Sequence, residues 1–267
     1  MTSAPSADAP LPDPTPSPAV RLADVTLRYP RGVVALDGVS LRIEHGERVG
    51  VVGPSGVGKS SLINLLNGRA ALDGATVSGS VDVLGVDPSR LGERARRRHA
   101  ARVGTVRQAL DLVGSMRVIH NVNAGRLGRW STVRAVPSLL WPADTDRAGE
   151  ALSLVGLDRS LLRARVDELS GGQQQRVAVA RLLAQAPTLT LADEPVSSLD
   201  PTTSEMVLEL LADPPAGHDW TLLVSVHQPA LARRFVDRLV GMRDGRIVFD
   251  APTASVSEAD LTELYHR

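Results

Sequence analysis

The chain has 267 residues, 43% of them hydrophobic, so it can form one large domain or two small ones with a substantial core. Its 30 basic and 30 acidic residues cancel, which gives no electrostatic argument for a polyanionic partner. The absence of cysteine excludes disulfides and thiolate metal sites, and no apolar run approaches the roughly 20 residues that cross a bilayer. Because no basic segment precedes Arg21, we expect no secretory signal and an intracellular, soluble chain.

The N-terminal region changes character at Val20. Residues 1–19 are mostly Ala, Ser, Asp and Pro, a composition that predicts a disordered tail. The short alternating segments 20–29 and 39–43 predict antiparallel strands. Residues 48–52 then predict a buried strand that leads directly into glycines.

A phosphate-binding P-loop follows this strand. The segment Gly53-Pro54-Ser55-Gly56-Val57-Gly58-Lys59-Ser60 matches the P-loop pattern in full and precedes an expected helix over residues 61–66. Glycines let backbone N–H groups converge on the α- and β-phosphates. Lys59 would reach the β- and γ-phosphate oxygens, and the Ser60 hydroxyl would ligate Mg²⁺.

Lys59 is also the only lysine of the chain, since the other 29 of the 30 basic residues are arginines. Chance survival is one explanation. The other is that a compact ammonium fits at this position where a forked guanidinium does not.

The next segments connect the P-loop to a glutamine. Residues 77–84 are expected to form strands, followed by an arginine-rich helix around residues 90–102. This helix could present a nucleic-acid surface, but a solvated helix face is favoured because the chain is neutral and lacks interleaved aromatic residues. A strand over residues 103–107 then leads to Gln108, which is expected to link a metal site to a mobile segment.

Residues 109–168 predict a helical insertion. Expected helices cover residues 146–154 and 161–166. Turns are expected at Gly125, Gly128, Pro137 and Pro142.

The stretch Leu169-Ser170-Gly171-Gly172-Gln173-Gln174-Gln175-Arg176 has the pattern of a helix start. Ser170, Gly171 and Gly172 would leave backbone N–H groups free at the positive end of the helix dipole, where a phosphate binds well. A turn of this kind is more often plain structure. The P-loop upstream and an acidic pair downstream favour phosphate binding here.

The acidic pair follows a predicted buried strand over residues 188–192. Asp193 and Glu194 would lie at the carboxyl edge of a sheet, where ligands bind in open α/β folds. Asp193 would hold Mg²⁺, and Glu194 would accept a proton from attacking water. A turn over residues 197–201 and a helix over residues 203–211 should follow.

Another predicted strand, residues 220–225, places His227 on the same sheet edge as Glu194, where it could contact a γ-phosphate. A helix near residues 231–238 and a hairpin of residues 239–243 and 246–250 should complete the fold. We expect no regulatory domain after this hairpin.

Taken together, these segments resemble the ATPase subunit of an ABC transporter over residues 20 to about 265. Six motifs stand in the family's order: the loop ending in Lys59 and Ser60, Gln108, the signature Leu169 to Gln173, the pair Asp193 and Glu194, the turn Ser197 to Asp200, and His227. Tyr29 falls where the family places an aromatic residue that stacks on adenine.

The resemblance implies an α/β P-loop NTPase fold with a mixed central sheet, an N-terminal antiparallel β subdomain and an inserted helical subdomain. Residues 20–267 would form this single domain, with a catalytic core of residues 20–108 and 169–267. The helical subdomain would cover about residues 109–168.

The resemblance also implies ATP and Mg²⁺ as ligands. The implied nucleotide-binding residues are Tyr29, Gly53, Pro54, Ser55, Gly56, Val57, Gly58, Lys59, Ser60, Ser61, Ser170, Gly171, Gly172, Gln173 and Asp200. Ser60, Gln108 and Asp193 would hold the metal. Glu194 would be the general base, with His227 and Gln108 as further catalytic residues.

In this family two copies pair head to tail, so each ATP would lie between the P-loop of one copy and the Ser170 turn of the other. Asp200 would contact the opposite copy. Permease subunits would dock near Gln108, placing the chain at the cytoplasmic face of a membrane, with a solute-binding protein as an indirect partner and no nucleic acid.

A finer likeness is to the ATPase of phosphonate importers, so the solute would be a phosphonate or a related oxyanion. It rests on residues 121–129, the triple glutamine 173–175, residues 192–196 and residues 227–228. Two departures are Arg107, where an aromatic residue is common, and Ser61, which replaces the usual Thr.

Two alternatives remain. The first is the ATPase of another ABC importer or of an exporter with the same fold. The second is a soluble ABC-type ATPase that acts on DNA or the ribosome. Those chains resemble tandem duplicates or domains split by a long coiled coil, whereas this chain has one motif set and an insertion of ordinary length.

Overall fold

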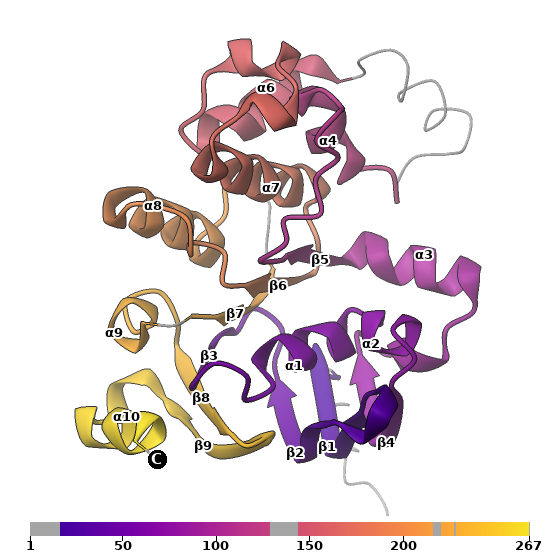
Figure 1. Ribbon diagram of the computed structural model, residues 1–267, viewed down its shortest axis with the longest axis vertical. Helices are drawn as coiled ribbons and strands as arrows, with labels where there is room; N and C mark the ends of the chain where they lie inside the picture. The colour runs from indigo at the N-terminus through magenta and orange to yellow at the C-terminus, as the bar shows by residue number, and fades with distance from the viewer. Residues whose placement is uncertain (1–16, 129–143, 216–219, 227, 267) are drawn as a thin grey trace, which may run out of the picture.

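The computed structural model describes residues 17–128, 144–215, 220–226 and 228–266 (Figure 1). Its strands are β1 (Val20–Arg28), β2 (Val34–Ile43), β3 (Arg48–Val52), β4 (Thr76–Val83), β5 (Val103–Val106), β6 (Leu189–Asp193), β7 (Thr221–Ser225), β8 (Arg238–Arg243) and β9 (Arg246–Pro252). Its α-helices are α1 (Lys59–Leu66), α2 (Arg69–Leu72), α3 (Glu93–Arg102), α4 (Val118–Ala124), α6 (Thr145–Leu154), α7 (Gly171–Gln185), α8 (Pro201–Ala212), α9 (Pro229–Ala232) and α10 (Glu258–Tyr265). Short 3₁₀ helices are η1 (Pro30–Gly32), η2 (Pro88–Arg90), η3 (Arg159–Arg163), η4 (Val166–Glu168) and η5 (Thr253–Ser255).

The expected antiparallel sheet is confirmed, with strand order β2-β1-β4. Strand β2 is longer than the expected segment 39–43 because it runs through Gly38, which adopts a positive φ of 63°. Register shifts between β1 and β2 accommodate this residue without ending the pairing. One face of β1 is buried, because apolar side chains alternate with exposed ones along the strand.

The central sheet is mixed, as expected, with order β5-β6-β7-β3-β8-β9. Its first five strands are parallel and β9 pairs antiparallel with β8. Successive side chains enter separate hydrophobic cores, since Leu191 belongs to one core and Ala192 to the other. The carboxyl ends of β3, β5, β6 and β7 therefore meet along a single edge of this sheet.

Helices α4, α6 and α7 form a group at one end of the molecule, while the three-stranded sheet lies at the other (Figure 1). Buried residues of α4, α6 and α7 belong to the same core as one face of the central sheet. The expected helical character of residues 109–168 is thus seen in α4 and α6. The expected turns at Pro137 and Pro142 lie outside the described residues.

Two helix predictions were wrong. Residues 161–166 are not one helix, because Ala164 and Arg165 are extended between η3 and η4. This segment bonds to residues 116–118 instead. The Val118 N–H donates to the Ala164 carbonyl at 3.0 Å, and the Val166 N–H donates to the Met116 carbonyl at 3.1 Å.

The helix expected near residues 231–238 is the four-residue α9, and Arg238 begins β8. The chain turns into the sheet at Asp237, whose N–H donates to the Arg48 carbonyl at 2.9 Å. Its carboxylate also pairs with the Arg48 guanidinium. This pairing across the sheet overrides the local helical pattern.

Helix α10 was not predicted, although its start has a capping signal. Ser257 accepts a hydrogen bond from the Asp260 N–H, and the Asp260 side chain bonds back to the Ser257 N–H. At the other end, Ala19 was expected in the disordered tail but is buried, with its carbonyl bonded to the Leu84 N–H.

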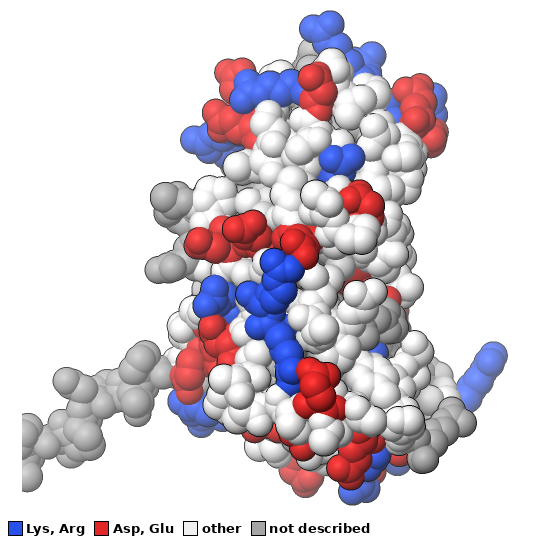
Figure 2. Space-filling view, turned by 90° about the vertical axis from the view of Figure 1, so that its left-hand side faces the viewer, with Lys and Arg blue, Asp and Glu red and all other residues white. Residues whose placement is uncertain are grey.

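Charges of both signs are interspersed on the molecular face shown in Figure 2. Arg233 pairs with Glu258 and Arg234 pairs with Glu205. On helix α3, Arg94, Arg97 and Arg98 are exposed, whereas His99 is buried. None of the helices within the described ranges has the length and apolarity needed to span a membrane.

Candidate functional site

A pocket of about 340 Å³ lies where three predicted motifs meet at the sheet edge. It combines the loop after β3, the segment after β5 and the residue after β6. The lining residues are Ser55, Gly56, Gly58, Lys59, Ser60, Ser61, Gln108 and Glu194. Residues far apart in the sequence are thus brought together by parallel strands that end at one edge.

The loop after β3 requires glycine at Gly53 and Gly58. Both adopt positive φ values, 146° and 108°. A Cβ at Gly53 would lie 2.2 Å from the Met242 carbonyl oxygen, and a Cβ at Gly58 would lie 2.4 Å from the Ala35 carbonyl oxygen. The loop backbone therefore packs directly against β8 and β2, and helix α1 begins immediately after it.

Lys59 lies at the first position of α1 and is only 5% exposed. Its Nζ donates to the carbonyls of Gly53 at 2.6 Å and Pro54 at 2.9 Å. Burial lowers the pKa of Lys59, while the charges of Glu194 and Asp193 act in the opposite direction. An anion bound in this pocket would further stabilise the charged form of Lys59.

Two other loop residues, Pro54 and Val57, make contacts within the protein. Val57 is buried in the core shared by the three-stranded sheet, and its carbonyl accepts from the Gly245 N–H at 3.1 Å. Pro54 contributes its carbonyl to Lys59. These contacts hold the loop against the protein, while Ser55, Gly56 and Gly58 line the pocket.

The acidic pair ends β6. Asp193 is 7% exposed and accepts a 2.7 Å hydrogen bond from the Ser225 hydroxyl. Glu194 has a φ of 51°, a left-handed conformation that is rare for a residue with a side chain. Its N–H donates to the carbonyl and the hydroxyl of Ser225, at 3.2 and 3.1 Å. The Asp193 side chain is therefore buried and hydrogen-bonded, whereas Glu194 lines the P-loop pocket.

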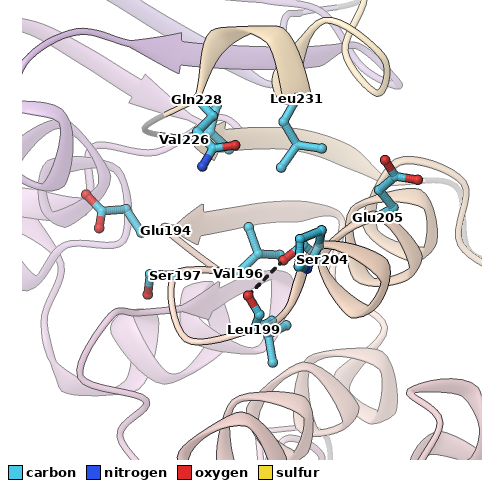
Figure 3. Close-up of a pocket in the computed structure, with 10 residues that line it drawn as sticks. Glu194, Val196, Ser197, Leu199, Ser204, Glu205, Val226, Gln228 and Leu231 are labelled. Atoms are coloured by element: carbon cyan, nitrogen blue, oxygen red, sulfur yellow. Dashed lines mark hydrogen bonds between the residues drawn. The ribbon is translucent and has the colours of Figure 1, made fainter.

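Glu194 also borders a second pocket of about 380 Å³, together with residues of the following turn, α8 and α9. Figure 3 shows Glu194 and Glu205 on opposite sides of this pocket, with Ser197 and Leu199 between them. Gln228 lines it as well. The neighbouring His227 lies outside the described residues, so its expected place near Glu194 stays a prediction.

Gln108 is followed by a strained loop that α7 holds in place. Leu110 and Asp111 adopt positive φ values of 56° and 48°. Arg181 of α7 donates to both of their carbonyls, at 2.8 and 2.6 Å. The buried Asn121 side chain binds the N–H and the carbonyl of Val113. The position of this loop therefore depends on α7 and α4.

The Ser170 turn begins α7 as expected. The Ser170 hydroxyl accepts from the Gln173 N–H, and the Gln173 side chain accepts from the Ser170 N–H, which forms a capping box. Ser170 and Gly171 are exposed, and Gly172 is half-buried. In the described part of the chain, residues 170–173 contribute nothing to the lining of the P-loop pocket. The N–H groups of Gly171 and Gly172, which the capping box does not use, lie at the start of a 15-residue helix.

Tyr29 and Asp200 lie apart from the P-loop pocket. Tyr29 is half-buried at the end of β1, and its N–H donates to the Val33 carbonyl at 2.8 Å. Val33 and Val34 beside it are exposed and add apolar surface that sequence reasoning missed. Asp200 is the N-cap of α8, and hydrogen bonds from the Thr203 hydroxyl and N–H lower the Asp200 pKa.

Sequence reasoning also missed two contacts to the pocket. The Tyr265 hydroxyl of α10 accepts from the Gly53 N–H at 3.1 Å. Gln175 of α7 donates to the Glu194 carbonyl at 3.2 Å. No local signal points to the Tyr265 contact, because 212 positions separate its partners. Gln175 could have been noticed as an amide among apolar residues of the helix.

The few oxygen ligands at this site suit a magnesium ion that would take its other ligands from phosphate. Among the described residues, no three His, Asp or Glu side chains gather into a metal-binding group. The hydroxyl of Ser60 and the amide of Gln108 line the same pocket, and Asp193 ends the adjacent strand. Oxygen ligands in small number fit Mg²⁺ better than a transition metal.

Sequence comparison connects this site to known proteins. A family model described as ABC transporter matches residues 36–197. The chain is 43% identical over 246 residues to phosphonates import ATP-binding protein PhnC 1 of Pseudomonas syringae pv. tomato, covering 92% of this chain and 91% of that protein. It is 44% identical to phosphonates import ATP-binding protein PhnC of Pseudomonas fluorescens, with the same coverage of both chains.

Solved structures agree with the fold. The ATP-binding cassette MJ0796, in a dimeric post-hydrolysis structure bound to ADP and Pi, superposes with a TM-score of 0.75 at 30% identity, covering 88% of this chain and 98% of that one. The cbiO1 protein of Clostridium perfringens, part of the ABC transporter complex cbiONQ, has a TM-score of 0.72 at 24% identity, covering 92% and 94%. This second likeness shows the fold alone.

The glycine geometry generates a prediction for Gly58→Ala. The new methyl group would meet the Ala35 carbonyl at a residue that already has a positive φ, so the loop must shift. We expect a loss of about 2 kcal/mol or more in the free energy of unfolding and weaker nucleotide binding. Denaturant unfolding and nucleotide titration measure the two effects.

Gly46→Ala is the matched control, because Gly46 also has a positive φ but a Cβ at this position would have no other atom within 4 Å. It should cost about 1 kcal/mol from backbone strain and leave nucleotide affinity intact. Equal effects of the two substitutions would contradict the steric argument.

Proposed function

The chain belongs to the ABC transporter family, and from this premise we propose that it is the ATP-hydrolysing subunit of an importer for phosphonates or a related oxyanion. The observation that carries the ATPase part is the convergence of Lys59, Gln108 and Glu194 on one pocket. The solute rests on the identity of 43% and 44% to two phosphonates import ATP-binding proteins over 92% of the chain.

The pocket residues have the chemistry that triphosphate hydrolysis requires. Lys59 and the N–H groups of the loop would bind the phosphate oxygens. Glu194 would accept a proton from water as the water oxygen attacks the γ-phosphorus and the bond to the β-phosphate oxygen breaks. We assign the γ-phosphate contact to His227. Ser60, Gln108 and Asp193 would hold Mg²⁺, which neutralises phosphate charge when bound.

We further propose that the complete site forms between two copies of the chain. Two observations support this. The Ser170 turn is exposed, and none of the described residues that line the P-loop pocket belongs to this turn. An outward-facing helix start can receive a phosphate that another copy holds. Tyr29 would stack on the adenine, and Asp200 would contact the opposite copy across the interface.

The remaining partners would be permease subunits and, through them, an extracytoplasmic solute-binding protein. The permease would dock near Gln108, where α7 and α4 hold the following loop, and would keep the ATPase at the cytoplasmic face of the membrane. Closure of two copies around ATP would then move the permease, and hydrolysis would release the pair.

Glu194→Gln tests the assignment of the general base. The amide cannot accept the water proton, so we expect kcat to fall by about 100-fold or more. ATP binding should persist, because Lys59 and its loop are unchanged. Phosphate release measures turnover, and light scattering with ATP measures pairing, which should become stable. Unchanged hydrolysis would remove Glu194 from the mechanism.

Lys59→Arg tests the need for an ammonium at the first position of α1. The larger planar guanidinium cannot reproduce the short bonds to Gly53 and Pro54. We expect ATP affinity to fall by about tenfold or more, since charge-assisted bonds contribute about 1.5 to 3 kcal/mol each. The reverse exchange at an exposed arginine, Arg69→Lys, is the control and should leave affinity intact. Full affinity of Lys59→Arg would make the lone lysine incidental.

The solute is tested by uptake. In cells of the source organism that lack this chain, entry of labelled methylphosphonate should be lost and should return with the intact chain but not with Glu194→Gln. Uptake of an unrelated solute, such as an amino acid, is the control. Loss of export or of amino-acid uptake instead would indicate another ABC transporter.

A further inference from the structure

Gln175 is the polar exception among the buried side chains of α7. The other buried residues of this helix are all apolar: Val177, Ala178, Val179, Ala180, Leu182 and Leu183. Gln175 is 2% exposed. A buried amide is costly unless its donor and acceptor both find partners.

Both ends of this amide bind the turn that follows β6. The Gln175 Nε2 donates to the Glu194 carbonyl at 3.2 Å, and Oε1 accepts from the Ser198 N–H at 3.1 Å. A carbonyl can only accept and a backbone N–H can only donate, so the orientation of the amide is determined. Gln175 therefore spans the turn from Glu194 to Ser198.

Glu194 needs such support because its backbone conformation is unfavourable. At a φ of 51° the Cβ of Glu194 crowds the backbone carbonyl oxygen that follows it, so this conformation is strained relative to the right-handed region. Its N–H is held by Ser225 and its carbonyl by Gln175, while the Ser197 N–H also donates to that carbonyl at 3.3 Å. Strained residues persist where surrounding bonds fix them.

The conformation matters because it sets the direction of the carboxylate. Glu194 lines both the P-loop pocket and the pocket formed with the following turn. A change in its φ would alter the direction in which the side chain leaves the strand end, and so its place in the P-loop pocket. A general base must lie within hydrogen-bond reach of the water it activates.

We propose that Gln175 is a positioning residue for hydrolysis, which holds the Glu194 backbone so that its carboxylate faces the P-loop pocket. The proposal rests on the proposed role of Glu194 as general base. It also links the two halves of the shared site, since Gln175 lies in the first turns of the helix that the exposed Ser170 turn begins. Displacement of α7 would reach Glu194 directly through this amide.

The test uses two substitutions at Gln175 in the full chain. Gln175→Met removes both hydrogen bonds at similar volume, and Gln175→Glu keeps an acceptor for the Ser198 N–H but loses the donor to the Glu194 carbonyl. We expect both to lower kcat by about tenfold or more, since small displacements of a catalytic group reduce rates strongly. The KM for ATP should change by less than about twofold, because Lys59 and its loop are untouched.

Gln185→Met is the matched control. Gln185 lies on the same helix and also donates to backbone carbonyls, those of Ala100 at 2.9 Å and Val103 at 3.3 Å, but it has no contact with the Glu194 turn. Loss of the Gln185 amide should lower the free energy of unfolding without changing kcat by more than about twofold. A kcat loss equal to that of Gln175→Met would reduce Gln175 to a general structural role and overturn the proposal.

A double substitution separates positioning from other effects. In the Glu194→Gln background, adding Gln175→Met should change residual hydrolysis by less than about twofold, because the group being positioned is already absent. A further tenfold loss would overturn the proposal, as would a folded Gln175→Glu variant with wild-type kcat. If Glu194→Gln alone keeps full hydrolysis, the proposed function fails instead, whatever the Gln175 variants do.

Discussion

The site depends on parallel strands whose carboxyl ends meet at one edge of the central sheet. The P-loop follows β3, Gln108 follows β5, and β6 ends at Asp193, with Glu194 directly after it. Because β3 lies between β7 and β8, its loop is supported on both sides, and Gly53 and Gly58 pack against backbone carbonyls of β8 and of the residue Ala35 in β2. The pocket follows from strand order rather than from any single motif.

Helix α7 contacts the site at several points. Its capping box presents the Ser170 turn outward, Gln175 binds the Glu194 turn, and Arg181 binds the loop after Gln108. Three parts of the proposed mechanism are therefore attached to one rigid element. A nucleotide held by another copy at the Ser170 turn would be connected to this copy's own pocket through α7 and the hydrogen bonds of Gln175 and Arg181.

Local patterns predicted most of the sheet and the pocket, because strand alternation and the P-loop spacing are properties of short segments. The antiparallel sheet and the hairpin of β8 and β9, which local patterns predicted, are confirmed, as is the mixed central sheet, which the family resemblance implied. The two wrong helix predictions and the missed contact of Tyr265 involve long-range bonds. Ala164 and Arg165 are extended where their segment bonds to residues 116–118. Asp237 is held at the sheet by Arg48, and Tyr265 of α10 binds Gly53. Periodicity carries no information about such partners.

The position of β3 has a consequence for biosynthesis. The P-loop is made early, yet the strands on both sides of β3 come from residues 221–225 and 238–243, and α10 supplies the Tyr265 hydroxyl still later. A nascent chain on the ribosome thus exposes the apolar strand β3 without its sheet neighbours until residues 221–243 have been synthesised. Such non-local pairing slows folding and favours aggregation, so chaperone demand should be concentrated in this interval.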